Sequence, residues 1–209
     1  MRRLISILVL FAASSFVDPL NEIRIVGSDT IYPLTLKAAE TFMRRSDIKV
    51  LVKGGGSNEG IKDLLEGKTD MAMISRDLKI EEELEMKEKK INHFIIGFDA
   101  LAIIVHPSNP IGKLTQQQLS DVFTGKITNW KQLGGKDLDV IVYTRKTTSG
   151  TYDYIMDHVL NNSKYSANSI ESPNTNQIIS SVAQTKGAIG YVGIAYVRNS
   201  VKTLALSFN

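Results

Sequence analysis

The sequence of 209 residues contains no cysteine. This absence excludes disulfides, iron–sulfur clusters, thiolate zinc sites, a cysteine nucleophile and lipid attachment at an N-terminal cysteine. Histidine is also scarce, because His93, His106 and His158 are the only three and no pair has the spacing of a metal-binding HxxxH motif. The sequence therefore offers no support for a metal site, and we expect no cofactor.

The chain also lacks a strong charge of one sign. It has 25 Lys and Arg against 22 Asp and Glu, a formal net charge of +3, and Arg2 and Arg3 supply two of these charges. A nucleic-acid-binding protein normally presents a basic face, so nucleic acid is not an expected partner. The densest charged segment, residues 79–90, mixes both signs and is typical of a solvated helix face.

Long apolar runs are confined to the N-terminus. Arg2 and Arg3 precede an apolar run from Leu4 to Ala13, and small residues follow it. This layout is typical of a secretory signal, and the run is short for a transmembrane helix. We therefore expect residues 1–15 to be a signal segment and the mature protein to be periplasmic or otherwise exported. A buried first strand or helix, or an uncleaved membrane anchor, are the alternatives.

From residue 23 onward, short β-rich runs alternate with amphipathic segments. The predicted strands are 23–26, 48–52, 71–74, 94–96, 100–105, 140–143, 188–192 and 201–206. The predicted helices are 33–44, 58–66, 79–90, 116–123, 152–160 and 178–183, with Thr115 as an N-cap. Strands that alternate with helices indicate an α/β fold with mostly parallel sheets.

Three segments share one design, in which a strand enters a loop rich in Gly, Ser or Thr and then a helix start. These segments are GSDTI (27–31), GGGSN (54–58) and RKTTSGT (145–151). A helix start presents unpaired N–H donors and a partial positive charge, and therefore attracts anions. The hydroxyls of Ser57, Ser149 and Thr151 can add donors, and Arg145 can offer a planar, two-pronged donor.

Because ligands of open α/β sheets bind at the carboxyl ends of the strands, the three loops predict one site for a tetrahedral oxyanion. Each element alone also has an ordinary structural explanation. Thr30 and Ser57 could be helix caps, Gly54–Gly56 could form a tight turn, and Arg145 could lie on the surface. Only the joint pattern favours anion binding.

Six segments that occur in order carry a resemblance to a known family. They are GSDTIYPL (27–34), GGGSNEGIKDL (54–64), DMAMISRDL (70–78), LTQQQLSDVFTGKITNW (114–130), TSGT (148–151) and GAIGYV (187–192). Together they resemble the periplasmic phosphate-binding proteins of high-affinity phosphate ABC transporters. The resemblance extends from about Ile23 to Leu206, and its most specific part is FTGKITNW, which looks structural.

The resemblance implies a two-lobed periplasmic-binding-protein fold with a hinge. Lobe 1 is expected to comprise residues 22–98 and a return segment, residues 198–209, and lobe 2 residues 99–197. The family normally continues beyond the last strand, so the C-terminal part looks shortened. The phosphate-binding residues that the resemblance implies are Thr30, the Ile31 N–H, Ser57, Arg145, Ser149, Gly150 and Thr151.

One position departs from the family. Many members carry an aspartate that accepts the proton of bound hydrogen phosphate, whereas this chain has Ser75 there, followed by Arg76. A carboxylate acceptor rejects a fully deprotonated anion such as sulfate, and a serine hydroxyl discriminates less. We expect both Ser75 and Arg76 to belong to the site, with Arg76 adding attraction for the anion, and phosphate to be preferred over sulfate.

The expected function is capture, without catalysis, of inorganic phosphate by a monomer that closes its two lobes and delivers the anion to a membrane ABC permease. Alternatives are a binding protein for sulfate or molybdate, a phosphoester hydrolase or phosphotransferase, and a module that kept the fold but lost the site. The sequence lacks the motifs that a hydrolase or phosphotransferase would need. Lys62 stands where a P-loop ending at Lys68-Thr69 needs its first glycine, and no GxSxG nucleophile elbow occurs.

Overall fold

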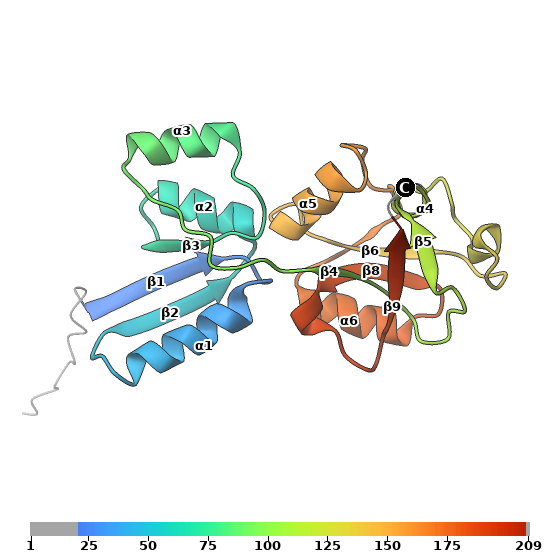
Figure 1. The fold of residues 1–209 in the computed structure, drawn as a ribbon, viewed down its shortest axis with the longest axis horizontal. Coiled ribbons are helices and arrows are strands. Elements are labelled where there is room, and N and C mark those ends of the chain that lie inside the picture. The colour runs from blue at the N-terminus through green and yellow to red at the C-terminus, as the bar shows by residue number, and fades with distance from the viewer. Residues whose placement is uncertain (1–20, 208–209) are drawn as a thin grey trace, which may run out of the picture.

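The computed structural model describes residues 21–207, which form two sheets joined by an extended connection (Figure 1). The predicted signal segment, residues 1–15, lies outside the described residues. We call the part around the first sheet the first lobe and the part around the second sheet the second lobe. No helix among residues 21–207 has both the length and the apolar character that a membrane span requires.

The first lobe contains a parallel sheet of three strands in the order β2-β1-β3. The strands are β1 (Glu22–Gly27), β2 (Lys49–Gly54) and β3 (Met71–Met73), and the helices are α1 (Tyr32–Met43), α2 (Ser57–Leu65) and α3 (Ile80–Glu88). The chain moves from β1 to β2 and then back past β1 to β3. Right-handed crossovers therefore place α1 and α2 on opposite faces, as Figure 1 shows.

The second lobe contains a six-stranded sheet in the order β5-β9-β4-β8-β6-β7. Its strands are β4 (Leu101–Val105), β5 (Lys113–Thr115), β6 (Ile141–Arg145), β7 (Ile170–Ser172), β8 (Ala188–Gly193) and β9 (Lys202–Ser207). Its helices are α4 (Gln116–Phe123), α5 (Gly150–His158) and α6 (Thr175–Gln184), with 3₁₀ turns at Trp130–Leu133 and Ile194–Tyr196. Among the pairings of these six described strands, those of β4 with β8 and with β9 are antiparallel and the others are parallel.

Strand β4 shows how the second lobe builds two cores. Ile103 and Val105 pack on the side that contains α4 and α5, whereas Ile104 packs on the side that contains α6. This is the alternation of a strand that is buried on both faces. The expected α/β fold with mostly parallel sheets is confirmed, and the Thr115 cap is also present, since its side chain accepts from the Gln118 N–H at 3.1 Å.

Two expectations about the chain path are wrong. Residues 198–209 were expected to return to lobe 1, but β9 pairs with β4 and β5 in the second sheet. Residues 94–96 were expected to form a strand, but residues 91–100 have no regular structure and Phe94 is 83% exposed. The reason in the second case is that no strand among residues 21–207 pairs with this apolar segment. The described chain therefore crosses between the sheets once, at residues 91–100.

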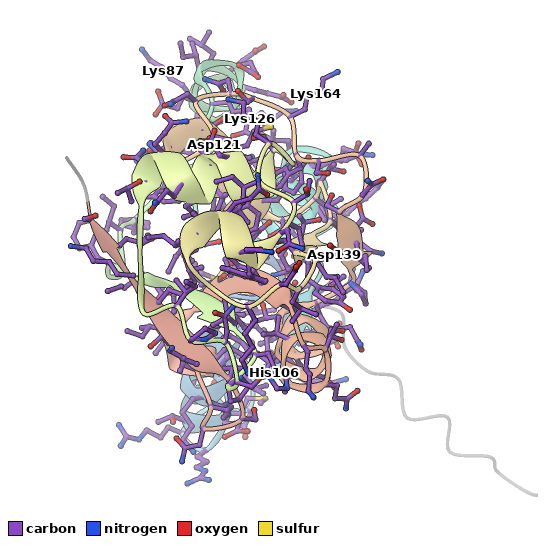
Figure 2. The ribbon with its side chains drawn as sticks, turned by 90° about the vertical axis from the view of Figure 1, so that its right-hand side faces the viewer. Lys87, His106, Asp121, Lys126, Asp139 and Lys164 are labelled. Atoms are coloured by element: carbon purple, nitrogen blue, oxygen red, sulfur yellow. The ribbon has the colours of Figure 1, made fainter. Side chains whose placement is uncertain are left out.

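The surface carries both signs of charge, as expected from the composition. Figure 2 views the molecule from the second-lobe end and labels side chains of both signs around the outside. Lys126 pairs with Asp121 at 3.3 Å, and Lys164 and Asp139 are exposed. The second lobe thus shows charges interspersed on this face rather than one basic patch.

Candidate anion-binding site

The three predicted loops converge between the two lobes. The hydroxyl oxygens of Thr30 and Thr151 lie 3.0 Å apart, although the residues belong to different sheets. Ser57 of the first lobe also lies against the second lobe. A Cβ added to Gly150 of the second lobe would stand only 2.3 Å from the Ser57 hydroxyl oxygen. The residue after Ser149 must therefore be glycine for the loops to approach this closely. The three segments form one cluster.

Strand register explains why the two first-lobe loops, residues 27–31 and 54–58, begin at the same edge of the sheet. Gly27 pairs with Gly54 on one side and with Met73 on the other, so all three strands of the first sheet end side by side. Helix α2 then begins directly at Ser57, after Gly55 and Gly56 adopt φ values of +151° and +103° that favour glycine. A Cβ on Gly56 would lie 2.2 Å from the Thr148 carbonyl oxygen of the facing lobe.

Each of the three loops leads into the N-terminus of a helix. Ile31 is the N-cap of α1, Gly56 that of α2 and Ser149 that of α5. In α5 the amides of Tyr152 and Asp153 donate to the Ser149 carbonyl, so the N–H groups of Gly150 and Thr151 precede the hydrogen bonds of the helix itself. Such N–H groups, together with the helix dipole, form a ready site for an anion.

Arg145 is the buried cation of this cluster. It ends β6, and its side chain is 4% exposed. One Nη1 hydrogen bond goes to the Thr175 hydroxyl at 2.9 Å, and Nη2 donates to the Asp29 carboxylate of the first lobe. The Nε–H has no acceptor in the described structure although the atom is buried. A guanidinium has five N–H donors, so Arg145 keeps donors for a further acceptor.

Asp29 is the site residue whose role the sequence reasoning missed. It lies inside the quoted segment 27–31, and its carboxylate reaches across the lobes to Arg145. Its backbone carbonyl accepts from the Tyr196 hydroxyl of the second lobe at 2.6 Å. The signal that could have identified it is general: a buried arginine in a near-neutral protein needs a carboxylate partner, and Asp29 is the acidic residue of the three segments 27–31, 54–58 and 145–151.

Hydroxyl groups line the first-lobe side. The Ser28 hydroxyl donates to the Ser75 hydroxyl oxygen at 2.7 Å, and the Ser57 and Ser75 hydroxyls lie 3.3 Å apart. The Ser75 N–H also donates to the Ser57 hydroxyl oxygen at 3.0 Å. Ser57 is fully buried. The structure therefore brings Ser75 next to Ser57, where a hydroxyl can donate or accept.

Two tyrosines of the second lobe, Tyr191 and Tyr165, form a hydrogen-bonded chain with the Arg145 backbone. The Arg145 backbone N–H donates to the Tyr191 hydroxyl at 3.2 Å, and the Tyr165 hydroxyl donates to the same oxygen at 3.2 Å. Burial raises the pKa of Tyr191 to about 12, and burial together with the neighbouring Tyr191 raises the pKa of Tyr165 further. Both tyrosines are therefore neutral at physiological pH and act as hydrogen-bonding supports.

Arg76 has different partners from those expected. Its guanidinium donates to the Glu82 carboxylate, to the Asn58 side-chain oxygen and to the Asp77 carbonyl, and these bonds use all five N–H groups. Burial opposes the charge on Arg76, but the hydrogen bond and charge of Glu82, with nearby Asp153, outweigh burial and raise the pKa of Arg76. The arrangement gives Arg76 no spare donor for an anion.

The FTGKITNW block is structural in this chain, as its resemblance implied. Trp130 is buried, and its indole N–H donates to the Gly187 carbonyl at 2.8 Å. It packs in the second-lobe core with Phe123 and Leu119. Within residues 21–207, no group of three or more His, Asp or Glu side chains is arranged to hold a metal ion.

Comparison with known proteins identifies the family of the chain. Residues 16–208 match the family model described as the PBP superfamily domain, and the chain belongs to this family. It is 32% identical to the protein SphX of Synechococcus elongatus, over 99% of this chain and 67% of that one. It is also 32% identical to the phosphate-binding protein PstS of Bacillus subtilis, over 90% of this chain and 62% of that one.

The likeness extends to a solved structure. A putative phosphate ABC transporter substrate-binding protein from Clostridium perfringens, solved with bound phosphate, superposes with a TM-score of 0.83 at 36% identity. The alignment covers 89% of this chain and 76% of that one. The chain thus spans between about three fifths and three quarters of the length of these relatives.

Proposed function

We propose that this chain is an exported binding protein that captures inorganic phosphate between two lobes, without catalysis, for delivery to a membrane ABC permease. The observation that carries the proposal is the convergence of three helix N-termini with Arg145, whose buried Nε–H has no acceptor among the described residues. Preorganised N–H donors of this kind replace the hydration shell of an anion. A phosphate-binding relative of high structural similarity supports the choice of ligand.

The proposed ligands are the hydroxyls of Thr30, Ser57, Ser75, Ser149 and Thr151, the N–H groups of Ile31 and Gly150, and the Arg145 guanidinium. Both lobes contribute, so an anion bound to all of them favours the closed arrangement over an open one. Arg76 is left out of this set because its donors are already used.

Asp29 supports phosphate as the preferred tetrahedral anion. Its carboxylate reaches the donor side of Arg145, and a carboxylate can accept a hydrogen bond but cannot donate one. Hydrogen phosphate carries a proton that such an acceptor can use, whereas sulfate presents only lone pairs and would be repelled. Asp29 thereby compensates for the serine at position 75.

The test is a calorimetric titration of the purified chain with phosphate, sulfate and molybdate at the same ionic strength. We expect phosphate to bind much more tightly than the other two anions. Equal affinities for phosphate and sulfate, or tighter binding of molybdate, would assign the site to another oxyanion. No binding of any anion would reject capture, and hydrolysis of a chromogenic phosphate ester would support the enzyme alternative instead.

The place of action follows from the N-terminal pattern and the family. The signal-like segment, residues 1–15, favours export, and the similar Clostridium perfringens structure is described as a phosphate ABC transporter substrate-binding protein. We propose that the protein acts as a monomer outside the cytoplasm, free or held by its N-terminal segment. Cell fractionation of the tagged full chain tests this, because recovery in the cytoplasm would exclude it.

A further inference from the structure

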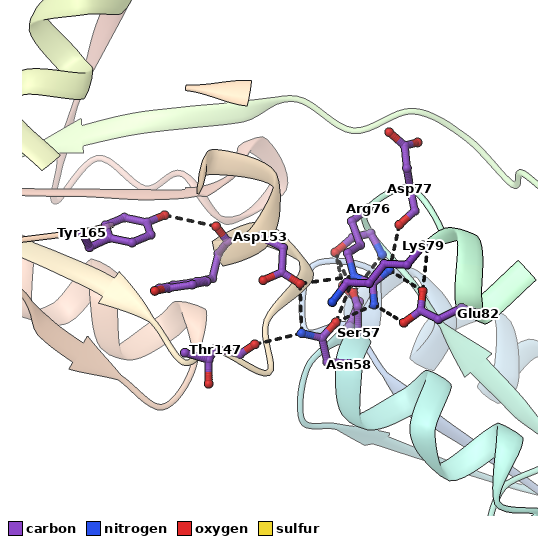
Figure 3. Close-up of polar contacts among 12 residues, drawn as sticks. Ser57, Asn58, Arg76, Asp77, Lys79, Glu82, Thr147, Asp153 and Tyr165 are labelled. Atoms are coloured by element: carbon purple, nitrogen blue, oxygen red, sulfur yellow. Dashed lines mark hydrogen bonds and ion pairs between the residues drawn. The ribbon is translucent and has the colours of Figure 1, made fainter. Parts of the chain in front are cut away.

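A second group of polar contacts joins the lobes beside the anion site (Figure 3). We call Asn58, Arg76, Glu82 and Asp153 the interlobe clamp. The first three belong to the first lobe, and Asp153 lies in the first turns of α5 in the second lobe. The Asn58 amide donates to the Asp153 carboxylate at 2.9 Å and to the Thr147 carbonyl at 2.8 Å, so it bonds twice across the lobes.

The first-lobe part of the clamp is held by its own lobe. Glu82 accepts two bonds from Arg76, at 2.7 and 2.8 Å, and one from the Lys79 N–H at 2.9 Å. Arg76 in turn holds the Asn58 side-chain oxygen through Nε at 2.9 Å and Nη2 at 2.6 Å. This leaves the Asn58 amide pointing at the other lobe as a preorganised donor.

Asp153 depends on the other lobe for its partners. Its Oδ2 accepts from Asn58 and lies 3.4 Å from the Arg76 Nε, and the residue is 8% exposed. Separating the lobes would remove both partners and return the carboxylate to water. Within residues 21–207 a single chain crossing joins the lobes, so closure depends on noncovalent contacts of this kind.

We infer that Asp153 is a positioning residue that holds the closed form and slows release of the bound anion without contacting it. The inference rests on the proposed function. Arg76 and Asn58 act with it as the matching surface of the first lobe, which gives Arg76 a role in closure instead of the expected role in anion attraction. The rate of release should depend on the clamp much more than the rate of binding, since contacts that form on closure act mainly on dissociation.

The experiment measures association of radiolabelled phosphate by rapid mixing and its release by a chase with unlabelled phosphate. Asp153→Ala should release phosphate about tenfold to a hundredfold faster, with association changed less than threefold. Asp153→Asn keeps an acceptor for Asn58 but loses the charge, so its release rate should lie between those of Asp153→Ala and the wild type. Asp137→Ala is the matched control, because Asp137 forms an exposed ion pair with Lys131 inside one lobe, and its release rate should not change.

A double-mutant cycle separates a clamp from a local effect on α5. Asn58→Ala should speed release as Asp153→Ala does, and the double variant should release phosphate more slowly than the product of the two single effects predicts, because both remove the Asn58–Asp153 hydrogen bond although Asn58→Ala also removes the bond to Thr147. Fully multiplicative effects, or an unchanged release rate in Asp153→Ala, would overturn the inference.

X-ray scattering of the phosphate-free protein measures how far the clamp holds the lobes closed when no phosphate is bound. Asp153→Asn and Asp153→Ala should both show a larger radius of gyration than the wild type and the Asp137→Ala control. Equal radii would contradict the clamp even if phosphate binds as proposed. Failure of the wild type to bind phosphate would reject the proposed function while leaving this comparison valid.

Discussion

Replacing Arg145 with alanine removes the buried cation of the proposed site. The side chain has five N–H donors, and the structure gives hydrogen bonds to protein acceptors for Nη1 and Nη2 only. The Nε–H and the second hydrogens of Nη1 and Nη2 therefore remain for an anion. If two of them bind phosphate, charge-assisted hydrogen bonds of about 1.5–3 kcal/mol each give a total loss of about 3–6 kcal/mol.

At one factor of ten per 1.4 kcal/mol, Arg145→Ala should weaken phosphate binding by about 100-fold to 20,000-fold. The unpaired Asp29 carboxylate that it leaves behind acts in the same direction, because it repels the anion. Arg145→Lys keeps the charge but not the planar pair of donors, so its affinity should be intermediate. Titration calorimetry measures all three proteins, with circular dichroism to establish that each is folded.

The control is Arg198→Ala, which removes an exposed arginine of the same lobe that donates only to nearby backbone carbonyls. Its phosphate affinity should stay within about twofold of the wild type, a change of about 0.4 kcal/mol. A folded Arg145→Ala protein with the affinity of this control would refute the assignment of Arg145 to the site.

Three further predictions concern packing and pH. Gly150→Ala should weaken phosphate binding, because its Cβ would stand 2.3 Å from the Ser57 hydroxyl and hold the lobes apart. Gly112→Ala is the control, since a Cβ there meets nothing within 4 Å and phosphate affinity should not change. Equal calorimetric affinities of the two variants for phosphate would contradict the prediction. Trp130→Phe should lower the free energy of unfolding by about 1–3 kcal/mol in urea titrations and leave phosphate affinity unchanged, since it removes the indole hydrogen bond to the Gly187 carbonyl and leaves a void in a buried core. Burial opposes the charge on Glu82, but the hydrogen bonds from Arg76 and Lys79 lower the pKa of Glu82 below 4.5. Glu82 therefore takes up its proton at a higher pH in the unfolded chain than in the folded one, and the free energy of unfolding should fall as pH drops below about 4.5. In Glu82→Gln the free energy of unfolding should fall less steeply with pH, and an unchanged slope would count against the ion pair.

Local signals in the sequence predicted the positions of the strand–loop–helix units well. The segments around Gly27, Gly54 and Arg145 each carry their own strand pattern, glycine or hydroxyl residues and helix start, so short-range chemistry is sufficient to place them. Their convergence followed from the rule that loops at the carboxyl ends of strands share one edge. The Thr115 cap belongs to the same class of local signal.

Contacts between distant segments were the part that the sequence did not predict. The short strands β5 and β7 contain three residues each, too few for a visible period, and they exist because a neighbouring strand pairs with them. Residues 94–96 show the reverse case, in which β-prone residues have no strand paired with them in the described part of the chain. The sheet that receives β9 and the partners of Arg145 and Arg76 likewise depend on tertiary packing, which no local pattern encodes.

The central claim is that three helix N-termini and Arg145 bind one phosphate between the lobes. A crystal structure of the protein grown with phosphate and without sulfate tests it most directly. We predict a single anion within hydrogen-bonding distance of Thr30, Ser57, Arg145 and the Gly150–Thr151 amides, with the Asp29 carboxylate near one phosphate oxygen. Phosphate bound at another place, or these groups bonded only to one another at saturating phosphate, would contradict the account.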